Sequence, residues 1–269
     1  MDKKELLRVF DQQQRIDDAS FPGACRDVAG PVIRVTIPDE GFGFIPYSTL
    51  NEENADAEIE MQIRFFAQQG VPEFEWKVYD HDQPADLRQR LAARGFEVED
   101  PEALMVLDLE NAPEFFWTME IPSLRRIVDA EGVDDIRWME EEVWGTDHSW
   151  MATRLVNDLI KVSDQLSIFA AEADGRVVST AWVYYHPPTQ FASLWGGSTL
   201  PAYRRRGYYT ALLVARAREA RERGFRFLTV DASPMSRPIL EKHGFQFLCF
   251  STPCTWKYSG QQPDGGEVG

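Results

Sequence analysis

The chain has 269 residues, enough for one large domain or two domains of ordinary size. Its composition, 43% hydrophobic and 12% aromatic, is that of a packed globular protein and excludes a disordered one. With 44 acidic residues against 28 basic ones, the formal charge of −16 disfavours general binding to nucleic acid and favours cationic partners such as amines.

The sequence lacks targeting signals and metal-ligand patterns. Residues 1–14 are polar and charged, and no run of about 18 apolar residues occurs, so we expect neither a signal peptide nor a membrane span. The cysteines, Cys25, Cys249 and Cys254, lack the spacing of metal ligands, and the histidines are scattered. We therefore expect a cytoplasmic protein with reduced cysteines, no bound metal and no membrane partner.

The sequence contains an internal repeat, in which similar segments occur in the same order about 150 residues apart. FEWKVYD at 74–80 matches FRFLTVD at 225–231, and in both halves a short helix closed by Gly-Phe follows. Upstream, Ser-Thr-Leu at 48–50 matches Ser-Thr-Leu at 198–200. Any two units of alternating strands and helices share some similarity, but several short matches in one order favour a duplicated domain.

From the repeat we predict two tandem copies. The first domain is expected at residues 1–112, the second at residues 113–258, and a disordered tail rich in Gly, Gln and Asp at residues 259–269. The boundary follows an apolar strand at residues 104–109, where two prolines are typical of a connector.

The elements of the second copy can be predicted in chain order from their periodicity. Its expected strands are residues 124–128, 166–173, 177–185, 191–199, 225–230 and 245–255. Its expected helices are residues 134–144, 150–162, 209–223 and 237–243. Antiparallel strands followed by a strand–helix–strand crossover predict an α/β fold with a mixed, mostly antiparallel central sheet and flanking helices.

The strongest motif is TLPAYRRRGYYTALL at residues 199–213, where a strand runs through a basic turn into a helix. The first amides of a helix have no intrahelical partner, and the helix dipole places partial positive charge there, so this turn can seat a pyrophosphate. Arg204, Arg205 and Arg206 add formal charge, and Gly207 lets the backbone approach a phosphate closely. The alternative is a solvated charged cap that binds nothing.

In this setting the turn resembles the R/Q-x-x-G-x-G/A loop by which the GNAT superfamily of N-acetyltransferases binds acyl-CoA. Arg204, Gly207 and Tyr209 fall on its positions, although Tyr209 replaces the usual glycine or alanine. The similarity covers about residues 124–255. It implies a GNAT fold in two tandem copies, with acetyl-CoA as the acyl donor.

The resemblance also implies roles for single residues. The main chain of Ser198, Thr199 and Leu200 would contact the pantetheine arm, and Ser233 stands where the family has an asparagine that contacts the cofactor. The family's proton-donating tyrosine is replaced by Leu240, which cannot donate a proton. The residues expected to hold the pyrophosphate are Arg204, Arg205, Arg206, Gly207, Tyr208, Tyr209 and Thr210.

Acyl transfer to an amine requires a base, because an ammonium must lose a proton before it can attack. The strand at residues 191–199 has no carboxylate, although many relatives carry a glutamate there. We single out Asp231 and Glu141 as candidate bases and Tyr209 as a candidate acid, with Tyr208 or water as the alternative proton donor to the thiolate. A glutamate run on a helix is more typical of a solvated face, and Asp231 of a turn cap. Further candidates for the base are Glu142, Asp147, His148 and Glu172.

The first copy is predicted to lack the cofactor site. After residues 48–50 it reads NEENADAEIEMQI, with carboxylates where the second copy has arginines, and with no glycine. Each carboxylate within a few Å of a pyrophosphate costs on the order of 1 kcal/mol. We therefore expect a degenerate first copy that packs on the second and walls the acceptor site.

The predicted function is transfer of an acetyl or other acyl group from acetyl-CoA to an amine of a small molecule or protein. A catalytically idle CoA-binding regulatory module is the alternative, favoured by Leu240 and by the missing strand glutamate. A tandem GNAT protein that uses aminoacyl-tRNA is disfavoured by the acidic charge. The acceptor amine is unknown, and a homodimer is left open.

Overall fold

The computed structural model describes residues 1–17 and 24–258 and divides into two compact units. Unit 1 comprises Met1–Gln14 and Ala103–Leu248, and unit 2 comprises Arg15–Glu102 and the segment from Cys249 onward. Each unit thus contains a segment from the far end of the chain. The predicted domains at residues 1–112 and 113–258 remain a prediction about where the repeats end, and the predicted tail lies outside the described residues.

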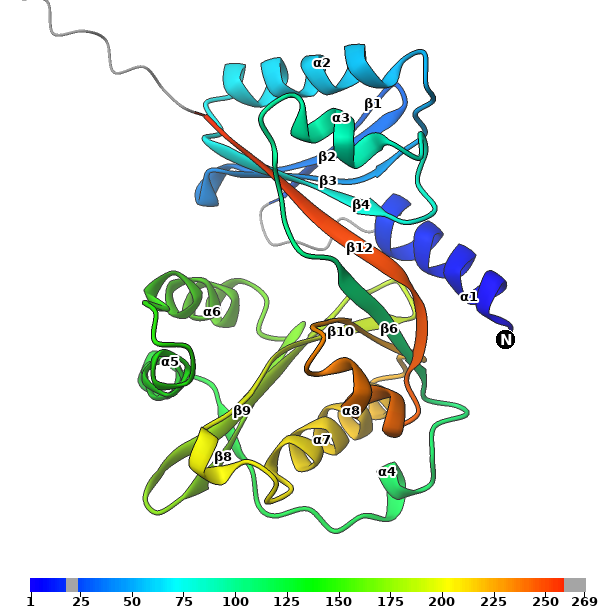
Figure 1. Cartoon of the computed structure of the whole chain (residues 1–269). Coiled ribbons are helices and arrows are strands. Elements are labelled where there is room, and N and C mark those ends of the chain that lie inside the picture. The colour runs from blue at the N-terminus through cyan, green and yellow to red at the C-terminus, as the bar shows by residue number, and fades with distance from the viewer. Residues whose placement is uncertain (18–23, 259–269) are drawn as a thin grey trace, which may run out of the picture. The chain divides into compact units, whose positions relative to one another are not determined.

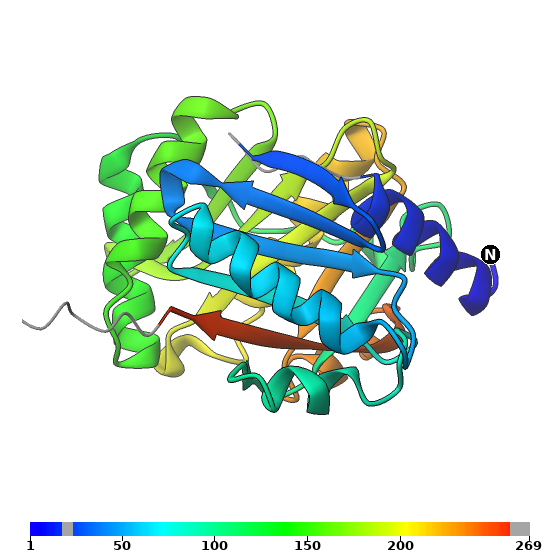
Figure 2. The same ribbon diagram turned by 90° about the horizontal axis from the view of Figure 1, so that it is seen from above.

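Unit 2 is built on strands in the order β1-β2-β3-β4-β12. These strands are β1 Cys25–Ala29, β2 Val32–Ile37, β3 Phe42–Ser48, β4 Glu73–Tyr79 and β12 Gln246–Lys257, with the two-residue β5 Glu97–Val98 paired to β12. β3 and β4 run parallel, and α2 Ala55–Gln68 connects them across one face of the sheet (Figure 2). The short helices are η2 Pro38–Glu40 and α3 Leu87–Ala92.

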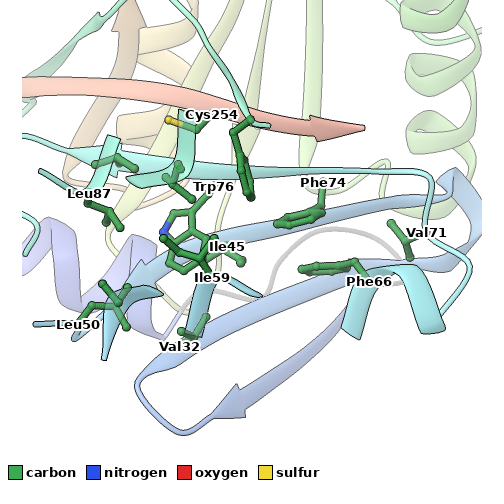
Figure 3. Close-up of a cluster of buried hydrophobic side chains, with 14 residues drawn as sticks. Val32, Ile45, Leu50, Ile59, Phe66, Val71, Phe74, Trp76, Leu87 and Cys254 are labelled. Carbon is green, nitrogen blue, oxygen red and sulfur yellow. The ribbon is translucent and has the colours of Figure 1, made fainter. Parts of the chain in front are cut away.

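Aromatic side chains fill the core of unit 2 beneath α2 (Figure 3). The Phe66 ring of α2 stacks on the Phe74 ring of β4 with centroids 4.3 Å apart. Gly43 of β3 makes room for this stack, because a Cβ there would lie 2.3 Å from the Phe66 ring. Trp76 is fully buried in the same cluster. These interactions fix α2 over the parallel strand pair.

Unit 1 contains the sheet order β6-β11-β10-β9-β8-β7. β10 and β11 run parallel, joined by a long helix, and the neighbouring strands are antiparallel. The strands are β6 Glu102–Asp108, β7 Arg125–Ile127, β8 Leu166–Ala173, β9 Arg176–Tyr185, β10 Phe191–Thr199 and β11 Phe227–Ala232. The helices are α1 Lys3–Phe10, η1 Asp11–Ile16, α4 Phe115–Thr118, α5 Ala130–Trp144, α6 Ser149–Lys161, η3 Pro201–Tyr203, α7 Tyr208–Glu222 and α8 Arg237–Lys242.

Helices cover both faces of this sheet (Figure 1). α5 and α6 pack on one face through an apolar cluster that includes Ile136, Leu155 and Trp182. α7 packs on the opposite face against β9 and β10. Because successive side chains of a strand point to opposite faces, β10 presents alternate residues to each helix layer.

The predicted fold class, a mixed and mostly antiparallel sheet with flanking helices, is confirmed. β8 and β10 have the predicted bounds, whereas α5 begins four residues earlier than expected, at Ala130. Asp129 explains this early start, because its side chain accepts a hydrogen bond from the Gly132 amide and caps the helix. Across residues 1–17 and 24–258, no helix has the length and apolar character needed to cross a membrane.

The packing of α2 gives a test of the unit 2 core. Phe66→Ala should lower the free energy of unfolding by about 3 to 5 kcal/mol, because it removes a buried ring and leaves a cavity. The control Met61→Ala, on the exposed side of the same helix, should change it by less than about 0.5 kcal/mol. Denaturant titration of both variants checks this, and equal losses would contradict the described orientation of α2.

Candidate functional site

The two parallel strands of unit 1 diverge soon after they meet. β11 pairs with β10 only from Phe191 to Ser193 and continues along β6 to Ala232. β10 remains paired with β9 as far as Thr199, with a bulge between Trp195 and Ser198. The second half of β10 therefore has one strand edge that β11 does not cover.

Two glycines shape the bulge. Gly196 has φ +59°, and a Cβ there would lie 1.8 Å from the Trp182 ring of β9, so the indole occupies the place of a side chain. A Cβ at Gly197 would lie 3.1 Å from the ring of Tyr209, which is the second residue of α7. The bulge thus brings the first turn of α7 against the uncovered half of β10.

A buried arginine of α7 forms hydrogen bonds to β9 and β10 just before the bulge. Arg216 is 2% exposed and donates to the carbonyl oxygens of Trp182 and Trp195, at 3.2 and 3.3 Å. A third bond runs to the Leu212 carbonyl of its own helix. Burial lowers the pKa of Arg216 to about 10. Within the described residues no carboxylate neutralises this charge, so a positive field acts beside the bulge.

A buried glutamate lies on the opposite face of β10. Glu140 of α5 is 3% exposed, and its Oε2 accepts hydrogen bonds from Ser198 Oγ at 2.7 Å and from Trp144 Nε1 at 2.8 Å. Its Oε1 is buried and has no hydrogen-bond partner among the described residues. Burial raises the pKa of the Glu140 carboxyl, while the bonds from Ser198 and Trp144 act in the lowering direction.

The basic turn has an unusual backbone. Arg205 and Gly207 both have positive φ, at 63° and 88°, and α7 begins directly after Gly207 without a side-chain cap. In the part of the chain that the structure describes, the amides of residues 205–210 have no hydrogen-bond acceptor. Such a run of free N–H groups at a left-handed turn and helix start is an anion-binding arrangement.

The three arginines of the turn leave their charges available. Arg204 donates from Nε to the Thr199 carbonyl at 3.1 Å, and the Arg206 guanidinium lies 5.0 Å from the centre of the Tyr203 ring. All three side chains are exposed, and within residues 1–17 and 24–258 none forms an ion pair. In a chain of net charge −16, three adjacent unpaired cations make this turn a local positive site.

The remaining predicted cofactor residues flank the turn. Thr210 Oγ1 lies 3.3 Å from His243 Nε2, and the Tyr208 ring packs beside Tyr203 at the edge of the α5–α6 cluster. Ser233 is exposed after β11, where its Oγ accepts from the Ser236 amide at 3.3 Å. Leu240 is 1% exposed and packs in the core.

The candidate acid and the two candidate bases lie in different surroundings. Tyr209 is half-buried, and burial raises the pKa of its hydroxyl, with the charge of Arg216 acting in the lowering direction. Glu141 forms an ion pair with Arg137 at 3.1 Å and accepts from the His148 amide at 3.3 Å. Asp231 lies in β11 opposite Leu104, two residues past the last one that pairs with β10.

The other candidate bases are engaged locally. Glu142 forms an ion pair with Arg176, and Asp147 Oδ1 accepts from Ser149 Oγ at 2.6 Å. His148 Nδ1 lies 2.9 Å from the Thr146 carbonyl, and Glu172 pairs with Arg125 at 3.1 Å.

Glu140 is not among the bases predicted from the sequence, because three successive glutamates are typical of a solvated helix face. The available signal was helical spacing, since Glu140 follows Ile136 by four residues and shares its buried side of α5. The sequence gives no comparable signal for Arg216, whose partners lie on two other strands.

The bulge geometry can be tested with two glycines of positive φ. Gly196→Ala should destabilise the protein by about 1 to 3 kcal/mol more than Gly145→Ala, because only the first methyl group would clash with Trp182. Both changes carry the same penalty of about 1 kcal/mol for an alanine at positive φ. Denaturant titration measures the difference, and equal losses would show that Trp182 does not fill the bulge.

Comparisons with known proteins agree with this geometry. Residues 130–245 match the family model described as "Acetyltransferase (GNAT) family". A GCN5-related N-acetyltransferase from Kribbella flavida superposes with a TM-score of 0.62 at 15% identity, covering 97% of this chain and 96% of that one. A tandem GNAT protein from the clavulanic acid biosynthesis pathway gives 0.58 at 13% identity, covering 89% and 85%.

A conserved protein of unknown function from Staphylococcus epidermidis ATCC 12228 has the same fold, with a TM-score of 0.64 at 11% identity, covering 88% of this chain and 96% of that one. No curated protein gave a significant sequence match. At these identities the structural likeness establishes the fold, and the family model identifies the domain. Residues 130–245 therefore resemble an acetyltransferase domain of the GNAT family, and the chain shares its fold with GNAT structures over most of its length.

Proposed function

We propose that the protein is an N-acyltransferase that binds acetyl-CoA in unit 1 and transfers the acyl group to an amine of a small molecule or protein. The observation that carries this proposal is the run of unpartnered amides at residues 205–210 beside three unpaired arginines. A pyrophosphate supplies the negative charge and the acceptor oxygens that both features require. The match of residues 130–245 to the GNAT family supports it.

The uncovered half of β10 suits the pantetheine arm of the cofactor. Its end is held from β9, where Ser179 Oγ donates to the Ser198 carbonyl at 2.6 Å and lies 2.7 Å from Thr199 Oγ1. Among the described residues, no strand pairs beyond Ser193 with the edge of β10 that faces away from β9. In this proposal Ser198, Thr199 and Leu200 contact the arm, and the thioester lies near the bulge at Gly196 and Gly197.

The corresponding turn in unit 2 is already satisfied internally. Asn51 Oδ1 accepts hydrogen bonds from the amides of Glu53 and Asn54, at 2.9 and 3.0 Å. Asp56, in the first turn of α2, pairs with Arg90 and Arg94, each at 3.2 Å. The same position that leaves amides free in unit 1 is therefore closed and acidic in unit 2, which favours a single cofactor site per chain.

A buried ion pair also lies where β3 and β4 of unit 2 separate. β3 and β4 pair only as far as Ile45 and Trp76. Beyond that point Arg15 donates from Nε to the Pro46 carbonyl at 2.9 Å, binds both oxygens of Asp82, and stacks 4.0 Å over the Tyr79 ring. A guanidinium that bridges both strands takes the space that a pantetheine arm would need.

On the leaving-group side we assign proton donation to Tyr209. Leu240 is buried and lacks a proton, whereas the Tyr209 ring lies against Gly197 at the bulge. Because burial raises its pKa, Tyr209 keeps its proton across the physiological range and can deliver it to a departing thiolate. The uncompensated charge of Arg216, two turns further along α7, would stabilise the same developing anion.

The second candidate is a CoA-binding module without turnover. The buried Leu240 and the absence of a carboxylate from β10 favour it. Release of free thiol from acetyl-CoA across a panel of amines separates the two functions. Tight CoA binding without thiol release for any amine would favour the idle module.

Binding of acetyl-CoA at the basic turn can be tested by substituting the two glycines that flank α7. Gly207→Glu should weaken acetyl-CoA binding at least tenfold, because a carboxylate would meet the pyrophosphate at close range. The control Gly224→Glu has the same positive φ and open surroundings, but it lies at the other end of α7. Calorimetric titration should find the control unchanged, and equal weakening of both variants would contradict the assignment.

The proposed acid can be tested by removing one hydroxyl. Tyr209→Phe should lower kcat about 100-fold and leave KM for acetyl-CoA nearly unchanged, because the lost proton acts only as the thiolate departs. Since its pKa is raised, the contribution of Tyr209 in the wild type should persist into alkaline pH. Tyr208→Phe is the matched control, and a similar loss of kcat there would argue against a specific role for Tyr209.

A further inference from the structure

Three carboxylates in the described residues are more than nine-tenths buried, and one of them lacks a cation. Asp82 is paired with Arg15 at 2.7 Å, and Asp158 has Arg154 at 3.8 Å and accepts from Tyr184 at 2.5 Å. Glu140 has only two neutral donors, both on Oε2, and its Oε1 has no partner. Because an unpaired buried carboxylate is costly, Glu140 calls for a functional explanation.

The position of Glu140 ties it to the proposed acyl site. Its partner Ser198 is the residue at which β10 resumes pairing with β9 after the bulge. Ser198 is itself 8% exposed; its hydroxyl donates to Glu140 of α5, and its carbonyl accepts from Ser179. A carboxylate is thereby coupled to a hydroxyl at the strand that would carry the thioester.

We propose that Glu140, acting through the Ser198 hydroxyl, is the proton acceptor for an acceptor amine that enters as an ammonium ion. This inference rests on the proposed function and narrows its substrate class to basic amines, which are protonated at neutral pH. It also replaces Glu141 and Asp231 as the base.

The proton movement balances without any further reactant. The ammonium N–H gives its proton to Ser198 Oγ while Ser198 gives its own proton to Glu140 Oε2. The amine nitrogen, now neutral, attacks the thioester carbonyl, and the C–S bond breaks as the leaving thiolate takes the proton of Tyr209. The acylated nitrogen then gives up its second proton, which returns to Tyr209 through solvent. Ser198 ends unchanged, Glu140 ends as a neutral acid, and a later exchange with solvent restores the carboxylate.

The environment of Glu140 suits this role. A buried site disfavours the carboxylate relative to the neutral acid, and the raised pKa moves Glu140 toward working pH. The ionisable group whose charge acts on it is His148, in the turn before α6, and the groups that touch it from β10 and α5 are the neutral Ser198 and Trp144.

The two buried charges also lie on opposite faces of the bulge. Glu140 reaches β10 from the α5 side just after it, and Arg216 reaches β10 from the α7 side just before it. A proton acceptor on one face and an uncompensated cation on the other match the two charges that develop when an amine displaces a thiolate.

Glu140→Gln is the direct test, since glutamine keeps the shape and can still accept from Ser198 and Trp144. With a basic amine, the variant should lose about 100-fold in kcat at neutral pH and bind acetyl-CoA as the wild type does. Its rate should rise toward that of the wild type as pH approaches the pKa of the amine, because a neutral amine needs no base. A merely structural role would not give this rescue. Glu131→Gln, exposed on the same helix, is the control and should be unchanged.

Ser198→Ala tests the relay. It should lower kcat to a similar extent, and the double variant should be no slower than either single variant, because both changes break one path. Fully additive losses, or wild-type activity in Glu140→Gln, would overturn the proposal. A loss of kcat in Asp231→Asn that is larger than in Glu140→Gln and is rescued at high pH would also overturn the proposal.

Binding and turnover measurements distinguish failure of the proposed function from failure of the role of Glu140. Failure of wild-type protein to bind acetyl-CoA in calorimetry would remove the proposed function itself. Binding of acetyl-CoA without turnover of any basic amine would retain the cofactor site and count against Glu140 as a base.

Discussion

The divergence of β10 from β11 after Ser193 is the feature on which the rest of the site depends. Two parallel strands gain main-chain hydrogen bonds by staying paired, so their divergence must be stabilised from elsewhere. Trp182 takes the place of a side chain at Gly196, and Arg216 binds the carbonyls of Trp182 and Trp195. The lost pairing is thus offset by packing and buried hydrogen bonds, and one edge of β10 stays available to a ligand.

The two units differ in the groups that lie between their separated parallel strands and at the turn before the connecting helix. Each has a parallel strand pair joined by a helix, and in each the pair separates after a few residues. In unit 2 a guanidinium bridges the separated strands and asparagine side chains satisfy the turn before the helix. In unit 1, within the described part of the chain, the amides of residues 205–210 and the charges of the three arginines have no partner. A small number of side chains therefore distinguishes the helix-start turn of unit 2 from that of unit 1.

The strands, the long helix and the basic turn could be predicted because each depends on contiguous residues. β10 is an apolar run bounded by turns, and the turn at residues 204–207 combines charge and glycine in one stretch. Helical spacing indicates only that Glu140 is buried, because its partner Ser198 lies 58 residues away. Arg216 has no such signal, and its partner Trp182 lies 34 residues away. The exchange of terminal segments between the units depends on strand pairing across the whole chain, which local pattern does not encode.

Amide hydrogen exchange with and without acetyl-CoA tests the central claim most directly, because it reports on the very N–H groups proposed to bind the diphosphate. Added acetyl-CoA should slow exchange across residues 205–210 and leave the corresponding turn before α2, where Asn51 accepts from the amides of Glu53 and Asn54, unchanged. Unchanged exchange at residues 205–210, or protection of the α2 turn instead, would contradict the assignment of the cofactor to unit 1.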